Sequence, residues 1–435
     1  MRAFTGQCVF LPVCLMNILF IHQNFPGQFK HLAPALAAAG HRCVALTLRV
    51  KKPVTWAGVE VLPYAVARST GSRGHPWLID LESKVIRGEA CFSAACALRD
   101  TGFVPDIILG HPGWGETLFL RDVWPNARIG LYFELYHQSD DSTLRFDPEF
   151  TTAEDEADAL RIRMKNLNNT MHLPICDLAI SPTRFQAATF PPAYQERISV
   201  IHDGIDTDLL KPNPQAKLAL PNHRAFDRTD EVITFVNRNL EPYRGYHVFM
   251  RALPQLLRQR PKAHVLMVGG DGVSYGPPPS QGGSWKELLI SEVRGQISDA
   301  DWARVHFLGR IPYRDFVSLL QVSRLHVYLT YPFVLSWSLF EAMSAGATIL
   351  ASNTAPLHEA IEHGKTGHLV DFFDTDGLVQ AANTLLEDAE TRARMGQAAR
   401  QFVQERYDLR RVCLPQQMQW VNRLAQRMPR PIAPY

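Results

Sequence analysis

The residues best placed for chemistry lie between positions 326 and 371. The run HVYLTYPF predicts a strand buried on both faces, and Ser336 and Ser338 follow it. FEAMSAG then predicts a helix that stops at Gly346. Backbone N–H groups and the dipole at such a helix start attract a diphosphate, and Glu341 in the first turn can accept hydrogen bonds from ribose hydroxyls. Acidic first turns are also common without a ligand, so spacing alone leaves both interpretations open.

Two arginines follow the first predicted strand of the second half of the chain. VITFV, from Val232, predicts the strand, and Arg238 and Arg244 come before the next helix. A guanidinium binds phosphate through paired hydrogen bonds. Two cations at the carboxyl end of a strand therefore indicate a phosphate site. The alternative is that both are ordinary surface arginines that bind no ligand.

Polar and aromatic side chains also follow three predicted strands in the first half. These strands are NILFI from Asn17, DIIL from Asp106, and the run that ends near Phe133. Loops at the carboxyl ends of such strands hold ligands in doubly wound sheets. Histidine can hydrogen-bond a sugar and tryptophan can stack on one, although each side chain alone also fits a structural role. The candidates are Gly27 and Gln28 in the first loop, His111, Trp114 and Glu116 in the second, and Glu134 and His137 in the third.

The elements that position these residues alternate along the chain. From Met16 the pattern is strand, loop, helix, glycine stop and strand, which predicts a βαβ unit in a parallel α/β layer. The first loop, HQNFPGQ, is not a G-x-G-x-x-G fingerprint, which counts against a dinucleotide-dependent oxidoreductase.

Composition limits the class of protein. The 435 residues are 46% hydrophobic and 20% charged, which is typical of a globular chain of two or three domains. A net charge of +2 without a dense basic run gives no indication of nucleic acid binding. Seven cysteines without a CxxC pair fit reduced thiols better than a disulfide framework or a zinc site, and we expect no metal.

The N-terminus has two interpretations. The apolar residues 8–21 are broken by Pro12 and Asn17 and are too short to span a bilayer, although they imitate a weak signal sequence. We favour the alternative, in which residues 1–15 are an extension outside the fold and Met16 begins the first domain.

Several of these motifs carry a resemblance to a known family. FEAMSAG, ATILASN and PLHEAI resemble the nucleotide-sugar site of family 4 glycosyltransferases, which are retaining enzymes of the GT-B fold. The family signature has a glutamate, seven residues, and a second glutamate. Glu341 matches the second glutamate, which binds donor ribose in the family, but Phe333 stands where the first, near the transferred sugar, is expected.

The resemblance implies an α/β fold with two Rossmann-like, doubly wound domains that face a central cleft. It predicts an N-terminal acceptor domain at 16–206, a linker at 207–229, a nucleotide-sugar domain at 230–404, and a C-terminal helix within 405–435 that crosses back to the first domain.

The resemblance also assigns roles to residues of this chain. Arg238 and Arg244 match cations that bind the donor diphosphate, and Glu134 falls near a family histidine that reaches the donor sugar. A carboxylate there would suit developing oxocarbenium charge. The implied catalytic residues are Arg238, Arg244, Glu134 and His111. The implied donor-binding residues are Gly27, Gly270, Leu308, Gly309, Tyr313, Ser336, Ser338, Leu339 and Glu341. The implied acceptor or sugar pocket contains Gln28, Trp114, Glu116 and His137.

The function implied is transfer of a sugar from a UDP- or GDP-linked donor to a glycan, lipid-linked or small-molecule acceptor, without another cofactor. Nucleic acid is not expected as a partner. The expected location is the cytoplasm, with peripheral membrane contact at its inner face as an option. Two alternatives remain: a nucleotide-sugar epimerase or hydrolase of the same fold, and a non-catalytic nucleotide-sugar binder, which Phe333 motivates.

Overall fold

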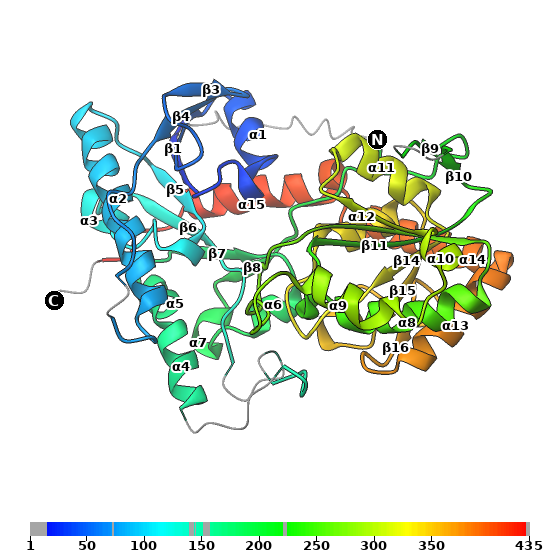
Figure 1. Ribbon diagram of the computed structural model, residues 1–435. Helices are drawn as coiled ribbons and strands as arrows, with labels where there is room; N and C mark the ends of the chain where they lie inside the picture. The colour runs from blue at the N-terminus through cyan, green and yellow to red at the C-terminus, as the bar shows by residue number, and fades with distance from the viewer. Residues whose placement is uncertain are drawn as a thin grey trace, which may run out of the picture.

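The computed structural model describes residues 15–71, 74–138, 143, 145–150, 157–220 and 224–431. The described chain forms two α/β domains that lie side by side (Figure 1). Most of the predicted N-terminal extension, residues 1–14, lies outside the described residues.

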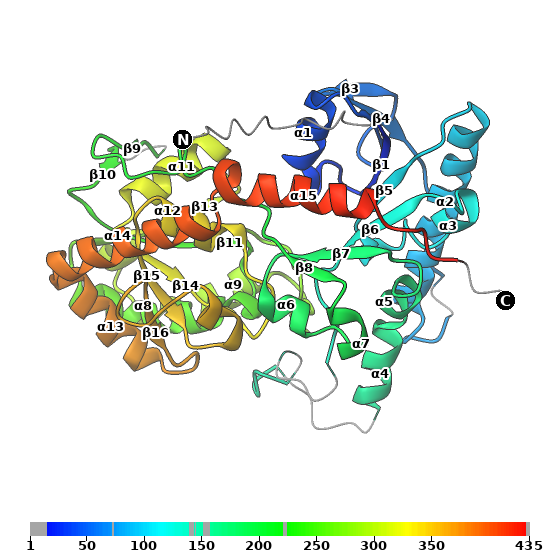
Figure 2. The ribbon, with the colours of Figure 1, turned by 180° about the vertical axis from the view of Figure 1, so that it is seen from behind.

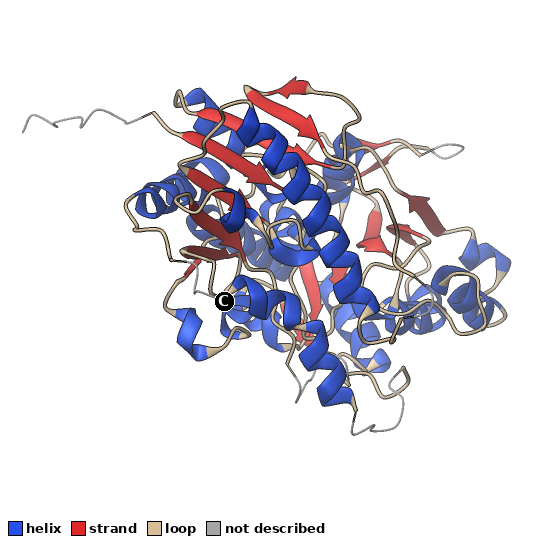
Figure 3. Cartoon of the chain, turned by 90° about the vertical axis from the view of Figure 1, so that its left-hand side faces the viewer, coloured by secondary structure: helices blue, strands red, loops and turns tan. Residues whose placement is uncertain are grey.

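The described part of the N-terminal domain is built on an eight-stranded sheet in the order β3-β4-β2-β1-β5-β6-β7-β8, and helices cover it in Figure 3. Neighbouring strands are parallel except β3 and β4. Central strands such as NILFI and IILG are apolar on both faces because helices pack on both sides. The strands are β1 (Asn17–Ile21), β2 (Arg42–Thr47), β3 (Val54–Trp56), β4 (Val59–Pro63), β5 (Ile107–Gly110), β6 (Arg128–Tyr132), β7 (Leu178–Ser181) and β8 (Ile198–Val200). The helices are α1 (Leu32–Ala38), α2 (Ile79–Asp100), α3 (Leu120–Val123), α4 (Asp158–Lys165), α5 (Leu167–His172), α6 (Arg184–Ala188) and α7 (Pro192–Gln195).

The C-terminal domain holds a parallel sheet whose described strands run in the order β13-β12-β11-β14-β15-β16. The strands are β11 (Glu231–Asn239), β12 (Ala263–Gly270), β13 (Val305–Gly309), β14 (Leu325–Tyr328), β15 (Thr348–Ser352) and β16 (His368–Val370). The helices are α8 (Tyr246–Gln259), α9 (Trp285–Arg294), α10 (Asp299–Trp302), α11 (Tyr313–Val322), α12 (Trp337–Ser344), α13 (Thr375–Glu387) and α14 (Ala389–Arg406). The capping box that Ser284 and Glu287 predict at the start of α9 is present.

The last helix returns to the first domain. Helix α15 (Leu414–Ala425) lies against the N-terminal sheet, as Figure 2 shows. Trp420 is 1% exposed, and its Nε1 donates a hydrogen bond to the carbonyl oxygen of Ala179 at 3.2 Å. The two domains are thereby linked by more than the connection near residues 207–229.

Three expected elements differ from the structure. Helix α12 begins at Trp337 rather than at Phe340, which places Glu341 in its second turn. The apolar spacing of Leu160, Met164, Leu167 and Met171 predicts one amphipathic helix between Thr151 and Leu173. The structure divides its described part into α4 and α5, while residues 151–156 lie outside the described residues. The expected linker carries a short antiparallel ribbon of β9 (Lys217–Leu218) and β10 (Phe226–Asp227). Among the described helices, none combines the length and the apolar character needed to cross a membrane.

Candidate active site

A cleft of ≈ 420 Å³ lies between the two domains, at the carboxyl ends of both parallel sheets. Residues after β6, β7 and β8 line one wall. Residues at the end of β11 and after β14 line the other. This is the edge where open α/β sheets hold ligands, because loops and helix N-termini converge there.

Arg244 anchors the C-terminal wall. It ends the short 3₁₀ turn η3 (Pro242–Arg244) and is 3% exposed. Its Nη1 donates to Thr330 Oγ1 at 2.8 Å and to the Val334 carbonyl at 2.9 Å, with a longer contact to Tyr328 Oη at 3.4 Å. A guanidinium fixed on one side and lining a cleft is preorganised for an anion.

Further donors surround Arg244. Arg238 is exposed near the C-terminal end of strand β11 and lines the same cleft. The start of α12 also lines it, and the Oγ atoms of Ser336 and Ser338 are 2.6 Å apart. The backbone N–H of Ser336 donates to Tyr328 Oη at 2.9 Å, which fixes the entry to the helix. Two cations, two hydroxyls and a helix N-terminus thus meet in one place.

Glu341 lies deeper in this wall, 7% exposed, and accepts a hydrogen bond from Tyr313 Oη at 2.8 Å. Burial raises the pKa of Glu341, although the bond from Tyr313 and the charge of Lys30 act against the rise. The same three residues line a side pocket of ≈ 110 Å³, where Lys30 Nζ lies 4.3 Å from the centroid of the Trp337 ring. A hydroxylated ring entering this pocket would meet both an acceptor and donors.

On the opposite wall, Glu134 and His111 lie close together. His111 Nε2 is 3.5 Å from Glu134 Oε2, and His111 Nδ1 accepts a hydrogen bond from the Gly113 N–H at 3.1 Å. Burial alone would raise the pKa of Glu134, but the hydrogen bond and charge of His111, together with His22 and Arg244, lower it. Glu134 lines the cleft as an ionised carboxylate, whereas His111 is buried behind it.

His22 completes this wall. Its Nε2 is 2.8 Å from Gln28 Oε1, and burial with the nearby charge of His111 lowers the pKa of His22 to about 3. The ring is therefore neutral at physiological pH. Gly27 adopts φ +47°, and a Cβ atom there would lie 2.3 Å from the ring, so glycine allows the loop to close over His22.

Asp203 joins the two walls. It is 4% exposed, and its Oδ2 accepts hydrogen bonds from Tyr132 Oη at 3.1 Å and from Trp337 Nε1 at 2.7 Å. Burial raises the pKa of Asp203 to about 6, despite these two hydrogen bonds. Because Tyr132 belongs to the N-terminal domain and Trp337 to the C-terminal domain, Asp203 connects the domains at the cleft.

Phe333, at the position of the expected first glutamate, belongs to an aromatic group. Its ring centroid lies 4.8 Å from that of Tyr275 and 5.7 Å from that of Tyr243. The Arg244 guanidinium lies over Phe333 at 5.6 Å and over Tyr275 at 5.0 Å. An apolar wall, with the cation beneath it, replaces the carboxylate of the family pattern.

The structure brings only part of the expected site together. The predicted residues that line the cleft are Arg238, Arg244, Glu134, Gln28, Ser336, Ser338 and Glu341. Tyr313 does not line the cleft itself but donates a hydrogen bond to Glu341, which does. Trp114 packs against His111, with ring centroids 4.5 Å apart.

Other expected positions lie elsewhere. Glu116 is fully buried and accepts a hydrogen bond from Tyr64 Oη at 2.8 Å, so it belongs to the domain interior rather than to an acceptor pocket. The backbone of His137 is hydrogen-bonded to Asn166, which places it beside α4 and α5. The Leu339 side chain is in the core, because an apolar residue in a buried helix turn packs inward. Gly270, Leu308 and Gly309 end neighbouring strands outside the cleft lining.

Sequence reasoning missed several lining residues. Asp203, Tyr132 and Trp337 lie in motifs that the sequence marks, namely HDGID, the strand before Glu134, and the segment between the two serines. Their meeting depends on the domain arrangement, which no local spacing encodes.

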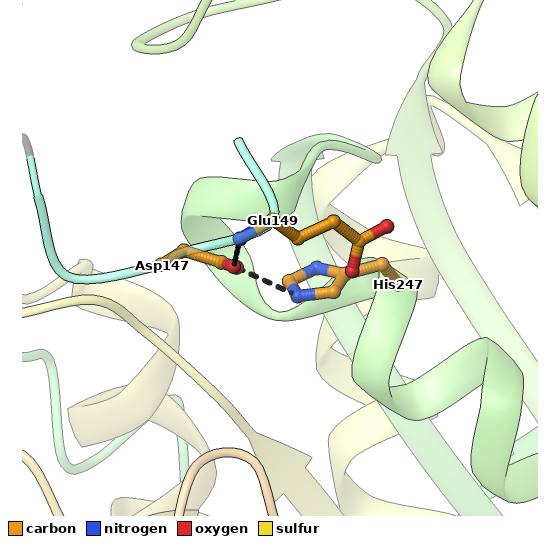
Figure 4. A group of neighbouring side chains, drawn as sticks. All are labelled: Asp147, Glu149 and His247. Carbon is orange, nitrogen blue, oxygen red and sulfur yellow. Dashed lines mark hydrogen bonds and ion pairs between the residues drawn. The ribbon is translucent and has the colours of Figure 1, made fainter. Parts of the chain in front are cut away.

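A second side-chain group has ligands of the kind that metals use. Asp147, Glu149 and His247 bring possible ligand atoms within 4.8 Å of one another (Figure 4). However, Asp147 Oδ2 already contacts His247 Nε2 at 2.9 Å and accepts from Tyr331 Oη at 2.6 Å. Glu149 is held by Arg251 through two bonds of 2.6 and 2.7 Å. These side chains thus join residues 145–150 to α8, and a metal ion that used Glu149 as a ligand would have to displace Arg251.

Two family models match the chain. The model described as "Glycosyl transferase family 4 group" matches residues 39–210, and "Glycosyl transferases group 1" matches residues 218–402. Together the matches cover most of both domains.

Curated relatives match over part of their length. The D-inositol 3-phosphate glycosyltransferase of Corynebacterium efficiens is 30% identical over 213 residues, 47% of this chain and 46% of that protein. The GDP-mannose-dependent alpha-(1-6)-phosphatidylinositol monomannoside mannosyltransferase of Mycolicibacterium smegmatis is 28% identical over 234 residues, 52% of this chain and 56% of that protein. The chain thus spans about half the length of the curated relatives it matches.

Solved structures match over nearly the whole chain. Sucrose-phosphate synthase from Thermosynechococcus elongatus has a TM-score of 0.72 at 19% identity and covers 95% of this chain and 100% of its own. Anabaena HepE in complex with UDP-glucose has a TM-score of 0.62 at 19% identity, with coverage of 95% and 100%. At these identities the likeness concerns the fold. Taken with the two family models and the two-sheet architecture, it shows that the chain belongs to the family 4 glycosyltransferases with the GT-B fold.

Proposed function

We propose that this protein is a retaining glycosyltransferase, which moves a hexosyl group from a UDP- or GDP-linked sugar to an acceptor held by the N-terminal domain. The observation that carries the proposal is the buried Arg244 guanidinium, fixed in a cleft that Arg238 and the start of α12 also line. This cluster suits a diphosphate because it combines two cations with the N-terminus of a helix, whose dipole attracts negative charge.

The reaction follows from this arrangement. The bond between the sugar anomeric carbon and the diphosphate oxygen breaks, and Arg238 and Arg244 stabilise the charge that develops on the diphosphate. The acceptor oxygen bonds to the anomeric carbon on the same face, and its proton passes to the departing diphosphate. Glu134, ionised on the other wall, lowers the energy of positive charge on the sugar ring.

Glu341 and Tyr313 fit the ribose of the donor, because the carboxylate accepts hydrogen bonds and the buried position excludes water. The acceptor enters from the wall built by the loops after β1 and β6. Family membership supports retention, and the curated relatives support a nucleotide-sugar donor, since one of them is named as GDP-mannose-dependent.

The first experiment measures nucleoside diphosphate released by the purified protein from a panel of UDP-, GDP- and ADP-sugars, with and without a glycan and lipid extract. Release that requires the extract is the expected result, and it identifies the donor. Release without extract would instead favour a hydrolase or epimerase.

A paired-variant test addresses the diphosphate site. Arg238→Ala and Arg244→Ala should each weaken binding of the free nucleoside diphosphate by about tenfold to a hundredfold, as expected for loss of a charge-assisted contact. Arg258→Ala, on the distant end of α8, serves as the control because its side chain is exposed and its one hydrogen bond to a described residue is a long one, 3.4 Å to the Gln296 carbonyl. Unchanged affinity in both site variants would contradict the diphosphate assignment.

One observation favours a second function. The aromatic group around Phe333 covers the place where the family pattern has a carboxylate, which is the arrangement a non-catalytic nucleotide-sugar binder would have. Tight binding of one donor without release, in the presence of the extract, would support that function over transfer.

A further inference from the structure

A second pocket, of ≈ 510 Å³, opens on the N-terminal domain beside the cleft. Its walls are the loops after β1, β2 and β4 and one side of α2. Because β1, β2 and β4 are parallel, these loops lie at the same edge of the sheet as the catalytic wall. The position is therefore one where an acceptor substrate can reach the cleft.

Positive charge dominates the lining. Arg49, Arg68 and Arg87 line the pocket, and no acidic residue does within the described chain. The backbone N–H of Arg49 donates to Thr47 Oγ1 at 3.2 Å, but the Arg49 guanidinium makes no hydrogen bond or ion pair with any residue that the structure describes. The Nη1 of Arg87 has one long contact, 3.4 Å to the Ser83 carbonyl. Because these three guanidinium groups make few hydrogen bonds to the protein, most of their N–H donors are available to a ligand.

The arginines are only weakly neutralised from outside the pocket. Arg68 lies 3.8 Å from Glu82 and 4.0 Å from Glu89, and its side chain is 60% exposed. Exposed ion pairs at such distances contribute little. The charge of Arg87 acts on the buried Glu116, where it opposes the rise in pKa that burial causes. Ordinary structural pairing therefore does not account for Arg49 and Arg68.

Neutral polar groups complete the pocket. Asn24, Ser69, Thr70 and Ser83 line it, together with Gln23. The Oε1 atom of Gln23 is buried and has no hydrogen-bond partner among the described residues. A buried, unpaired amide oxygen costs free energy, so it points to a hydroxyl or N–H that a ligand supplies.

One loop joins this pocket to the cleft. Gln23 and Asn24 face the pocket, whereas Gln28 of the same loop lines the cleft. His22 ties both ends, since its Nδ1 accepts a hydrogen bond from the Asn24 N–H at 2.9 Å and its Nε2 is 2.8 Å from Gln28. A ligand in the pocket would thus lie directly beside the residues on the acceptor side of the cleft.

We propose that this pocket binds a phosphate group of the acceptor, so that a hydroxyl of the same molecule points into the cleft. The inference rests on the proposed transferase function and adds the chemical class of the acceptor. Phosphate fits the pocket because its several oxygens can accept from three guanidinium groups and the surrounding hydroxyls together, whereas a carboxylate offers only two oxygens.

Two kinds of acceptor carry such a group, a soluble polyol or sugar phosphate and a phospholipid head group. The test uses glycerol 3-phosphate as the soluble probe and vesicles of phosphatidylcholine with or without phosphatidylinositol as the lipid probe. Calorimetry measures binding of the first, and co-sedimentation measures binding of the second. Wild-type protein should bind at least one probe, and which one it binds identifies the source of the phosphate.

The decisive variant is Arg49→Gln with Arg68→Gln, because both side chains are exposed and their replacement does not disturb the core. Its affinity for the bound probe should fall by about tenfold to a hundredfold. Arg42→Gln is the matched control: Arg42 is an exposed arginine of the same domain, 3.9 Å from Glu60, at the opposite end of β2. It should bind the probe as the wild type does.

Nucleoside diphosphate binding is measured on the same proteins to separate this inference from the proposed function. The double variant Arg49→Gln with Arg68→Gln should bind nucleoside diphosphate as tightly as the wild type, since neither residue lines the cleft. If neither probe binds, or if the double variant binds as tightly as Arg42→Gln, the phosphate pocket is overturned while the transferase can still stand. If no nucleotide sugar is bound or consumed, the proposed function fails regardless of the pocket.

Discussion

At the scale of single residues, the cleft holds two carboxyl groups whose surroundings move their pKa values in opposite directions. The pKa of Glu134 is lowered because His111 outweighs the effect of burial. Burial raises the pKa of Asp203 to about 6. Near neutral pH both are ionised, but mild acid protonates only Asp203. We therefore propose different tasks for the two residues: electrostatic stabilisation for Glu134 and a pH-dependent contact between domains for Asp203.

Glu134→Gln should lower kcat by about a hundredfold while changing the KM for donor little, because the charge matters most when positive charge develops on the sugar. Initial rates at varied donor concentration measure both constants. Glu196→Gln, an exposed carboxylate of the same domain, is the control. A rise in KM without a fall in kcat would assign Glu134 to donor binding instead.

Asp203 should produce an acidic limb in the pH–rate profile. Above its pKa of about 6 the carboxylate accepts charge-assisted hydrogen bonds from Tyr132 and Trp337, and below that pH these bonds weaken. Activity should therefore fall as the pH drops through about 6, and Asp203→Asn should remove this limb. A wild-type limb that persists in Asp203→Asn would assign the titration to another group.

The raised pKa of Asp203 affects stability in the opposite direction from activity. Because the folded pKa of Asp203 lies above its ordinary value, the contribution of this group to the free energy of unfolding decreases as the pH rises from about 4 to about 6. The fold thus keeps a buried carboxylate at a cost in stability, which is expected of a functional group rather than a structural one.

At the scale of elements, the turn before α8 sets the position of Arg244. Gly245 adopts φ +65° immediately after Arg244, and a Cβ atom there would lie 2.2 Å from Leu329 Cβ. The residue after η3 must therefore be glycine for the turn to pack against the segment that follows β14. This close approach brings Arg244 beside Thr330 and Val334.

Gly245→Ala should lower the free energy of unfolding by about 2 kcal/mol or more and weaken nucleoside diphosphate binding, because both the backbone strain and the clash displace Arg244. Thermal unfolding and calorimetry measure the two effects. Gly102→Ala is the control, since Gly102 also has a positive φ, +88°, but nothing lies within 4 Å of its Cβ position. If both variants lost the same stability and the same affinity for nucleoside diphosphate, the effect would come from backbone strain alone and not from the clash with Leu329.

At the scale of the whole molecule, the domains are held together at several places besides the chain connection. Helix α15 packs on the N-terminal sheet, and residues 145–150 pack on the C-terminal domain. In that second contact, Asp147 and His247 are each almost fully buried. The cleft thus lies between domains whose relative position is fixed on two sides.

Asp147→Ala should cost about 3–5 kcal/mol, because it leaves His247 and Tyr331 buried without their partner. Differential scanning calorimetry measures the loss, and small-angle scattering tests whether the domains move apart. The exposed Glu292→Gln, which removes the Arg251 contact at 2.5 Å, is the control and should change stability little. No change in Asp147→Ala would mean that this contact does not hold the domains.

The pH dependence of this contact follows from the lowered pKa of Asp147. Burial alone would raise that pKa, but the hydrogen bonds from His247 and Tyr331 outweigh it. The stabilisation is therefore present above the ordinary aspartate pKa and is lost as the pH falls below about 4. A chelator should leave the melting temperature unchanged, because Arg251 already pairs with Glu149 through two hydrogen bonds.

The sequence predicted the strands well, and it marked several residues that the structure places in the C-terminal wall. β1 and β15 lie where apolar runs indicate them, and the glycine stop at Gly346 has the left-handed φ of +77°. Arg238 lies near the end of β11 and Arg244 in the turn that follows it, whereas Glu341 lines the cleft from α12, after the loop that follows β14. Glu116 was placed wrongly because spacing shows that a residue follows a strand, but not whether its side chain turns inward to a partner such as Tyr64.

The sequence by itself thus determined the α/β class and the residues that a parallel sheet must present at its carboxyl edge, because period and strand ends are local properties. Only the tertiary structure decided which residues meet across the domains. Asp203 and Trp337 are 134 residues apart, and Asp147 and His247 belong to different domains. The environments that shift the pKa values of Asp203 and Glu134, and the grouping of Arg49, Arg68 and Arg87, likewise arise only when distant loops come together.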